Sequence, residues 1–414
     1  MRYFHRRLYL AIAILGLAQG QALAENITPN LQFNGYATAG AAWINNHNDV
    51  KYVNDIQSDP SIDHDSVAGL QFNYKANDRT NLVTQLTARQ GDQDFSVKAN
   101  WAYIAYRLDD DFTVRAGRFA FPTYLYSENL YVGQAYPWAR LPTEIYSTLG
   151  GLYNLDGVDM LYRHSFDDWN LTLQPVLGTS QLVGFSVKNM RGLTASMGND
   201  NLTLHVGTML SDVDSSLSTQ PAGAAAIANA DAGLAAQLTA ANMSAAIPAA
   251  TQALNAELVS ALDFKNARAT YNDIGVLYDD GQWFATAEYA QLRFKGWIQD
   301  FNAGYASVGY YVGKVLPYVL YSRIKPVNND EATAGFPPDT TPIAQGIWQS
   351  NLQDQSSLAL GMRYAVSSGI SVKAQVDRIY NFHGTNGLFT VPASMPQGSL
   401  GTVYLYSLSL NVAF

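Results

Sequence analysis

The sequence predicts an all-β protein, a transmembrane antiparallel β-barrel of about 16 strands. Three observations support this fold class: apolar residues alternate with small or polar ones, short turns alternate with longer connections, and charge is scarce. Only 14% of the 414 residues are charged, against about 25% in typical globular chains. A helical membrane protein is excluded, because no stretch after residue 24 offers about 18 consecutive apolar residues.

The first 24 residues have the organisation of a secretory signal peptide. Three arginines precede the apolar run from Leu8 to Leu17, and the tripeptide Ala22-Leu23-Ala24 follows it. The run is too short to span about 30 Å of hydrocarbon, so we expect cleavage before Glu25 and one mature domain, residues 25–414. The mature chain is acidic, which argues against nucleic-acid binding, and the absence of cysteine excludes disulfides and cysteine-ligated metals.

A two-residue alternation predicts the strands. In the final segment, Tyr404, Leu408 and Phe414 share an apolar face, while Ser407 and Asn411 lie on a small or polar one. Such segments match the length of about 9–11 residues that a tilted strand needs to cross a bilayer. The first strand is expected from about Leu31 to Trp43, and the alternation recurs in residues 70–74, 202–206, 358–364 and 370–376.

Seven short turns punctuate the chain, rich in Asn, Asp and Gly because these residues tolerate the positive φ of tight hairpins. They lie at residues 75–78, 109–111, 166–168, 198–200, 279–281, 313–314 and 367–369. With a first and a last strand the total becomes 16, and eight longer connections are expected at the opposite rim. This organisation is typical of bacterial outer-membrane barrels.

Alternating strands also build soluble sandwiches and propellers, whose polar faces carry many Lys and Glu residues. Here the polar face is rich in Thr, Ser, Asn, Gln and Gly, and large aromatic residues stand at strand ends, as girdles at the membrane surfaces would require. These aromatic residues are Trp43, Trp101, Tyr103, Trp169, Trp283 and Tyr404.

The signal peptide, the hairpin-ordered strands and the terminal Phe414 together resemble the porins of the Gram-negative outer membrane. A local run resembles the third loop of a less characterised proteobacterial branch of that family: Gly117-Arg118-Phe119, Pro122, Tyr126-Ser127, Tyr136-Pro137-Trp138, Pro142 and Glu144-Ile145-Tyr146. The Pro-Glu-Phe-Gly-Gly sequence of enteric general porins is missing, so solute preference cannot be transferred. The resemblance implies an outer-membrane location, contact with membrane lipid and lipopolysaccharide, a homotrimer, and recognition of Phe414 by the barrel-assembly machinery.

The third long connection, residues 118–156, is the expected constriction loop, because its prolines and tyrosines suit a segment folded into the lumen. Strand phase assigns inward-facing residues, and in the strand that holds Lys98 it directs Val97, Trp101 and Tyr103 toward lipid. The channel-lining or constriction residues predicted in this way are Arg89, Lys98, Arg115, Arg118, Glu128, Arg140, Glu144, Asp159, Glu288, Arg363, Lys373 and Asp377.

Two interpretations of these charges remain open. Basic residues on the wall opposite acids on the loop would create a transverse field that favours charged or dipolar solutes. Alternatively, each arginine pairs with a neighbouring carboxylate and holds the loop in place.

An Ala-rich segment breaks the strand pattern in the fifth long connection, residues 211–266, expected on the extracellular side. Leu234 and Leu238, and then Leu254, Leu258 and Leu262, recur at i, i+4, which predicts short amphipathic helices interrupted at Pro248. The segment is interpreted as a cap over the channel mouth, a docking element or a low-complexity insertion.

The predicted function is passive diffusion of small hydrophilic solutes and ions through a water-filled channel, without enzymatic activity and without a cofactor. The alternatives are an outer-membrane hydrolase and a surface-interaction barrel. No two His residues have the i, i+4 spacing of a zinc helix, and no Gly-x-Ser-x-Gly motif is present. His205 is inward by strand phase, whereas the hydrolase needs a Ser and a His that face lipid.

Overall fold

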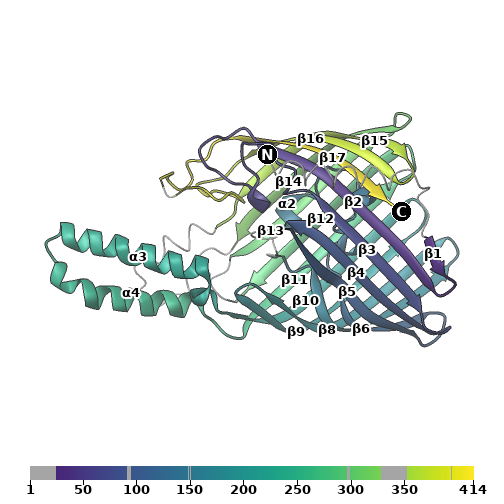
Figure 1. Ribbon diagram of the computed structural model, residues 1–414, viewed down its shortest axis with the longest axis horizontal. Helices are drawn as coiled ribbons and strands as arrows, with labels where there is room; N and C mark the ends of the chain where they lie inside the picture. Colours follow the sequence, from purple (N-terminus) through teal and green to yellow (C-terminus); the bar gives the residue numbers. More distant parts are fainter. Residues whose placement is uncertain are drawn as a thin grey trace.

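The computed structural model describes residues 25–90, 95–147, 149, 151–295, 299–327, 352–392 and 394–414. Within these residues, sixteen strands, β2–β17, pair antiparallel with their neighbours in chain order. The last strand pairs with the first of them, from Leu405 opposite Ile44 to Ala413 opposite Tyr36, so the sheet closes into a barrel (Figure 1). The fold class is therefore confirmed. The expected signal peptide, residues 1–24, lies outside the described residues.

The elements of the wall have the following bounds. They are β1 (Glu25–Thr28), β2 (Leu31–Ile44), β3 (Val67–Lys75), β4 (Thr80–Gln90), β5 (Phe95–Arg107), β6 (Phe112–Ala120), β7 (Asn154–Phe166), β8 (Trp169–Leu182), β9 (Phe185–Gly198), β10 (Leu202–Ser215), β11 (Ala267–Asp279), β12 (Trp283–Phe294), β13 (Asp300–Tyr310), β14 (Val315–Val327), β15 (Gln355–Ser367), β16 (Ile370–Tyr380) and β17 (Val403–Ala413).

The two faces of the strands differ as the alternation predicts. On β16, Val372 and Val376 are exposed on the outer surface, while Lys373 and Gln375 are buried on the lumen side. Closure pairs the backbone groups of the wall, which is the condition for a sheet to exist in hydrocarbon. The outer face can then be apolar without a second layer to cover it.

All seven predicted short turns connect neighbouring strands at one rim, which we call the short-turn rim. The opposite, long-loop rim differs from expectation in three places, because the connections at residues 91–94, 183–184 and 295–299 are short. Strands β8 and β9 are joined by Val183 and Gly184 alone, with Leu182 opposite Phe185. Gly184 has a φ of 78°, which suits a two-residue hairpin turn. The expectation of a longer connection here was wrong, because Val-Gly supplies turn geometry without the Asn and Asp of the other turns.

The predicted lipid-facing positions of Trp101 and Tyr103 were also wrong, because β5 contains a β-bulge at Asn100. Gln85 lies opposite Trp101 and Leu86 lies opposite Ala99, so Asn100 is the extra residue. Beyond it the alternation changes phase: Ile104 is exposed outside, while Tyr103 packs inside against Phe119 with their rings 6.4 Å apart.

The C-terminal residue completes the closure. Gly35 and Phe414 exchange two backbone hydrogen bonds, of 2.8 and 2.9 Å. The Phe414 ring lies over Gly35 and 5.7 Å from the Phe33 ring. A Cβ atom at Gly35 would collide with this ring and displace it from the barrel wall.

The Ala-rich connection, residues 216–266 between β10 and β11, forms a helical hairpin of α3 (Pro221–Ala240) and α4 (Ile247–Leu262). Leu254 and Leu258 are buried between the two helices, as their spacing predicts, and Pro248 lies in the first turn of α4, where proline is tolerated. The hairpin projects away from the barrel (Figure 1), so it does not cap the mouth. Neither this hairpin nor any other described helix is long and apolar enough to cross a membrane.

Deletion of Phe414 is expected to reduce the amount of folded barrel in the membrane, because the last ladder bonds and the ring contact are lost. Gly35→Val should have the same effect, since overpacking of this kind costs about 1–3 kcal/mol. The measurement is the folded fraction on heat-modifiable gels of membrane extracts. Gly401→Ala is the control, because a Cβ there meets no atom within 4 Å. Wild-type levels in both test variants would contradict the closing role of this contact.

Candidate functional site: the lumen and its third loop

A long loop leaves the wall after β6 and folds into the lumen before it returns at β7. The loop comprises residues 121–153, which is shorter than the predicted 118–156, because residues 118–120 and 154–156 still pair across β6 and β7. Its aromatic side chains pack against the lumen faces of β11–β13, with Trp138 fully buried beside Tyr305 and Phe284. The loop therefore fills part of the barrel interior, and wall contacts fix its position.

Glu144 anchors the loop to β14 and β15. It lies on the short helix α2 (Thr143–Tyr146) and is only 1% exposed. Its carboxylate accepts hydrogen bonds from Ser322 Oγ at 2.6 Å, from Gln355 Nε2 at 2.7 Å and from Ser357 Oγ. A carboxylate that accepts several hydrogen bonds in this way holds the loop, and its burial keeps it out of contact with passing solute.

Glu288, on β12, anchors the first part of the same loop. Its carboxylate accepts the Leu125 backbone N–H at 3.0 Å and the Tyr146 hydroxyl at 2.6 Å. Burial holds the pKa of Tyr146 well above its usual value, and the nearby Glu288 charge adds to this effect. Tyr146 therefore remains a hydrogen-bond donor at any physiological pH.

Lys373 anchors the middle of the loop to β16. Its ammonium group donates to the carbonyl oxygens of Gly133 and Trp138 and lies 4.5 Å from the centre of the Tyr136 ring. Two positions along the strand, Gln375 accepts the Ala139 N–H at 3.1 Å and donates to Asp377 at 2.8 Å. Lys373 and Asp377 are thus buried on the lumen face beneath the loop.

Two arginines are paired with carboxylates inside the barrel. Arg115 on β6 contacts Asp159 of β7 in a bidentate pair, with Nε 3.0 Å from Oδ1, and lies 3.4 Å from the exposed Glu128 of the loop. Arg140 on the loop pairs with Asp65, with Nε 3.1 Å from Oδ1. Burial acts to lower the pKa of Arg140, but the Asp65 charge and hydrogen bonds raise it above its usual value, so the pair stays ionised.

Arg118 occupies an outward position of β6, although its side chain also borders a cavity that Arg89 and Lys98 line. It lies one residue before Phe119, which is buried inside, and it pairs across the ladder with Asp156. Both side chains are about half exposed, and Arg118 Nε is 2.7 Å from Asp156 Oδ1. The sequence analysis places Arg118 at the start of the constriction loop, whereas β6 continues through Ala120 and keeps its alternation.

Three of the predicted lumen cations differ from Arg115 and Arg140, which are each paired with a carboxylate. Among the described residues, no carboxylate lies within ion-pair distance of Arg89, Lys98 or Arg363. Arg89 stacks on the Tyr131 ring at 5.2 Å, and Arg363 lies beside Lys373 across β15 and β16. Like Lys373, these three side chains are lumen-side cations for which the described residues supply no ion-pair partner.

Sequence reasoning missed several partners of the loop, notably Asp65, Gln355 and the serines that bind Glu144. Asp65 belongs to the first long connection, and no sequence pattern links it to Arg140. The two serines occupy inward positions of β14 and β15, where the phase of a strand could have pointed to them.

Glu144→Ala is expected to release the loop, because Ser322, Gln355 and Ser357 lose their common acceptor. The expected result is a loss of about 2 kcal/mol of stability and larger fluctuations of single-channel current. Thermal unfolding in detergent and planar-bilayer recording measure the two effects. Asp110→Ala, at an exposed turn of the short-turn rim, is the control. An unchanged melting temperature together with quiet channels would argue against the anchoring role.

No family model matches this sequence, and no curated protein matches it either. The fold is nevertheless similar to solved bacterial proteins. OmpF of Salmonella typhi, solved in complex with daunomycin, is 15% identical over 95% of this chain and 100% of its own, with a TM-score of 0.53. An anion-selective porin from Comamonas acidovorans is 12% identical over 93% of this chain and 99% of its own, with a TM-score of 0.53.

OmpT, an outer-membrane protein of Vibrio cholerae solved in a trimer form, is 13% identical over 93% of this chain and 99% of its own, with a TM-score of 0.52. At such identities the likeness concerns the fold alone. The chain therefore has the closed 16-strand fold of Gram-negative outer-membrane barrels.

Proposed function

We propose that the protein is a porin-like channel in the outer membrane of a Gram-negative bacterium, through which small hydrophilic solutes and ions diffuse passively. One observation carries the proposal: a loop of the chain is anchored inside a closed barrel, by Glu144 and Glu288, and narrows the lumen without sealing it to the wall on every side. Two spaces of about 910 and 470 Å³ remain between the loop and the wall.

The lumen charges support a preference for anions. Arg115 and Arg140 are paired with carboxylates, so their charges are largely compensated, and the buried Glu144 and Glu288 line neither of the two spaces. Arg89 and Lys98 line both remaining spaces without a described carboxylate partner. Uncompensated charges of one sign in a narrow, low-dielectric passage concentrate counter-ions of the other sign. This placement weighs more than the acidic net charge of the chain.

A second candidate function has one observation in its favour, a row of Ser196, His205 and Asp273 across β9, β10 and β11. Ser196 Oγ is 2.8 Å from His205 Nδ1, and His205 Nε2 is 3.2 Å from Asp273 Oδ2. These are the residue types of a serine hydrolase. The row faces the lumen, however, and the Thr123 carbonyl oxygen of the loop lies 3.3 Å from His205 Nε2, so substrate access is blocked.

Further proposals concern assembly. A homotrimer in contact with outer-membrane lipid and lipopolysaccharide is supported by the trimer form of the similar OmpT and by the apolar outer face. Recognition of Phe414 by the barrel-assembly machinery is proposed from its terminal position in the closing strand. Cross-linking of purified protein in detergent tests the trimer.

Arg89→Gln combined with Lys98→Gln is expected to shift the reversal potential in a KCl gradient toward cation preference, because two lumen charges are removed. Lys265→Gln combined with Arg268→Gln removes two exposed cations that line neither space and is the matched control. The measurement is planar-bilayer recording of the purified protein. A folded wild-type protein without any conductance would overturn the channel proposal, and an unchanged reversal potential in the double variant would overturn the assigned anion preference.

Ser196→Ala is expected to leave esterase activity at the level of a blank reaction, as in the wild type. Turnover of a short-chain nitrophenyl ester by the wild type that disappears in the variant would instead favour the hydrolase. Conductance of both proteins, recorded in parallel, reports whether the barrel is folded.

A further inference from the structure

A groove of about 940 Å³, which we call the outer groove, crosses the outer surface of the barrel over β10–β14. It is lined by the small residues Ala287 and Ala306, which lie opposite each other on β12 and β13. Val206 and Ile274 border it and are 51% and 59% exposed. Small residues flanked by larger exposed apolar ones form a furrow that a hydrocarbon chain can enter from outside.

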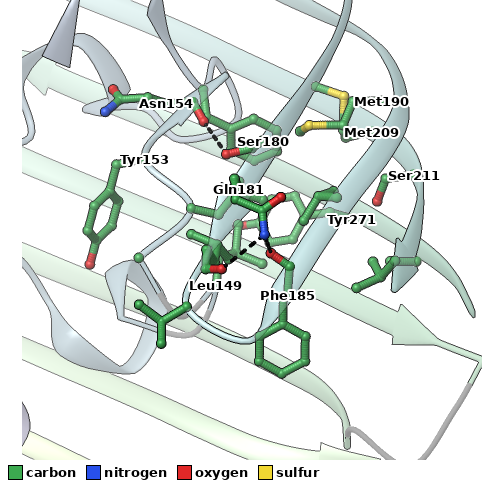
Figure 2. Close-up of a pocket in the computed structure, with 18 of the residues that line it drawn as sticks. Leu149, Tyr153, Asn154, Ser180, Gln181, Phe185, Met190, Met209, Ser211 and Tyr271 are labelled. Carbon is green, nitrogen blue, oxygen red and sulfur yellow. Dashed lines mark hydrogen bonds between the residues drawn. The ribbon is translucent and has the colours of Figure 1, made fainter. Parts of the chain in front are cut away.

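Open access distinguishes the outer groove from the lumen cavity of about 910 Å³. In that cavity Met190 and Met209 lie side by side in the wall (Figure 2) and are only 1% and 3% exposed. Two lumen residues, His205 and Glu288, also border the outer groove, but their side chains bond to the third loop, so they contribute backbone atoms to its floor. A ligand therefore reaches the outer groove from the membrane.

Cations lie where the outer groove reaches β14. Lys325 lies opposite Asn302 and Arg323 lies opposite Gly304, at consecutive outward positions about 7 Å apart. Arg293 of β12 donates to Asn302 Oδ1 at 2.7 Å, which places a third cation beside them. All three lie in the halves of their strands toward the long-loop rim, whereas outward positions in the other halves of β12–β14 carry no Lys or Arg.

The acids nearby neutralise only part of this charge. Asp354 pairs with Arg323 at 2.6 Å, and the buried Asp300 accepts a backbone N–H of the neighbouring strand at 2.6 Å. Among the described residues, no carboxylate lies within ion-pair distance of Lys325 or Arg293. Like charges this close are unfavourable, and an anion between them would stabilise the arrangement.

Two tyrosines indicate the level of these cations in the membrane. Tyr289 and Tyr321 line the outer groove and are 43% and 44% exposed. Aromatic residues on the outside of barrels gather where acyl chains give way to headgroups. Lys325 and Arg323 follow Tyr321 toward the long-loop rim, which is the extracellular side in such barrels. The cations therefore lie at the level of the outer headgroups, and Ala306 lies at the level of the acyl chains.

We propose that the outer groove binds a phosphorylated lipid of the outer leaflet, with an acyl chain over Ala287 and Ala306 and its phosphates beside Lys325, Arg323 and Arg293. Clustered cations at the membrane surface recognise anionic headgroups in this way. Charge complementarity favours a lipid over a second copy of this chain, because the cores of protein interfaces are depleted of charge. The inference deepens the proposed contact with lipid by naming its site and headgroup chemistry, and it does not depend on conduction.

The test compares three probes by native mass spectrometry of the purified protein in detergent. Diphosphoryl lipid A carries both features, monophosphoryl lipid A keeps the acyl chains but has one phosphate fewer, and inorganic pyrophosphate has no acyl chain. The dissociation constant of diphosphoryl lipid A is expected to be about tenfold lower than that of the monophosphoryl form, because one more phosphate accepts hydrogen bonds from the cations. Pyrophosphate is expected to remain unbound.

Variants separate the two halves of the site. Lys325→Gln should raise the dissociation constant of diphosphoryl lipid A about tenfold. Lys314→Gln removes an exposed cation at the other end of β14 and is the matched control. Ala306→Phe fills the outer groove and should weaken binding of both lipids. Ala102→Phe, at an exposed position of β5, is the control for the added ring.

Equal affinity for the two forms of lipid A overturns the site, and so does equal weakening by Lys325→Gln and Lys314→Gln. Occupation by a second copy of the chain would appear as an Ala306→Phe variant that becomes monomeric with unchanged affinity for lipid A, which also overturns it. Conductance of the same preparations tests the channel separately. A conducting protein without lipid preference loses only this site, and a folded protein that binds lipid without conducting loses only the channel.

Discussion

The structure depends on one constraint: within hydrocarbon, every backbone donor and acceptor of the wall needs a partner. The ladder between β17 and β2 meets it, and the bonds between Gly35 and Phe414 extend the ladder to the final residue. Once the sheet is closed, alternate side chains must face either lipid or an enclosed interior. The apolar outside and the mostly polar inside of the barrel follow from that closure, and so does the need for something to occupy the interior.

The third loop occupies the interior through polar anchors more than through apolar packing alone. Glu144 receives three side-chain donors from β14 and β15, Glu288 holds the beginning of the loop, and Lys373 binds its carbonyl oxygens. Polar positions on the lumen face would be costly under a covering loop if they were left unpaired. Because these wall groups are paired with groups of the loop, the inner surface of the barrel stabilises one conformation of the loop.

Strand phase and turn chemistry were sufficient to predict most of the wall from the sequence, because closure forces a strict two-residue period on each strand. The prediction failed at the β-bulge in β5 and at the tight turn between β8 and β9, because no distinctive residue type marks either feature. Asn100 is an ordinary polar residue in the sequence, and Val183-Gly184 resembles a strand interior. The partners of the loop were harder still, since Asp65 meets Arg140 only through tertiary structure, 75 positions apart.

The extra residue at Asn100 has a consequence for the surface that the bilayer meets. Without this residue, the side chains of the rest of β5 would exchange faces. Ile104 and Tyr106 would point into the aqueous interior, and Tyr103 would lose its contact with Arg115 and point toward the acyl chains. Asn100 therefore sets the alternation of the second half of β5. It determines which side chains contact the acyl chains of the lipid and which pack against the buried Arg115.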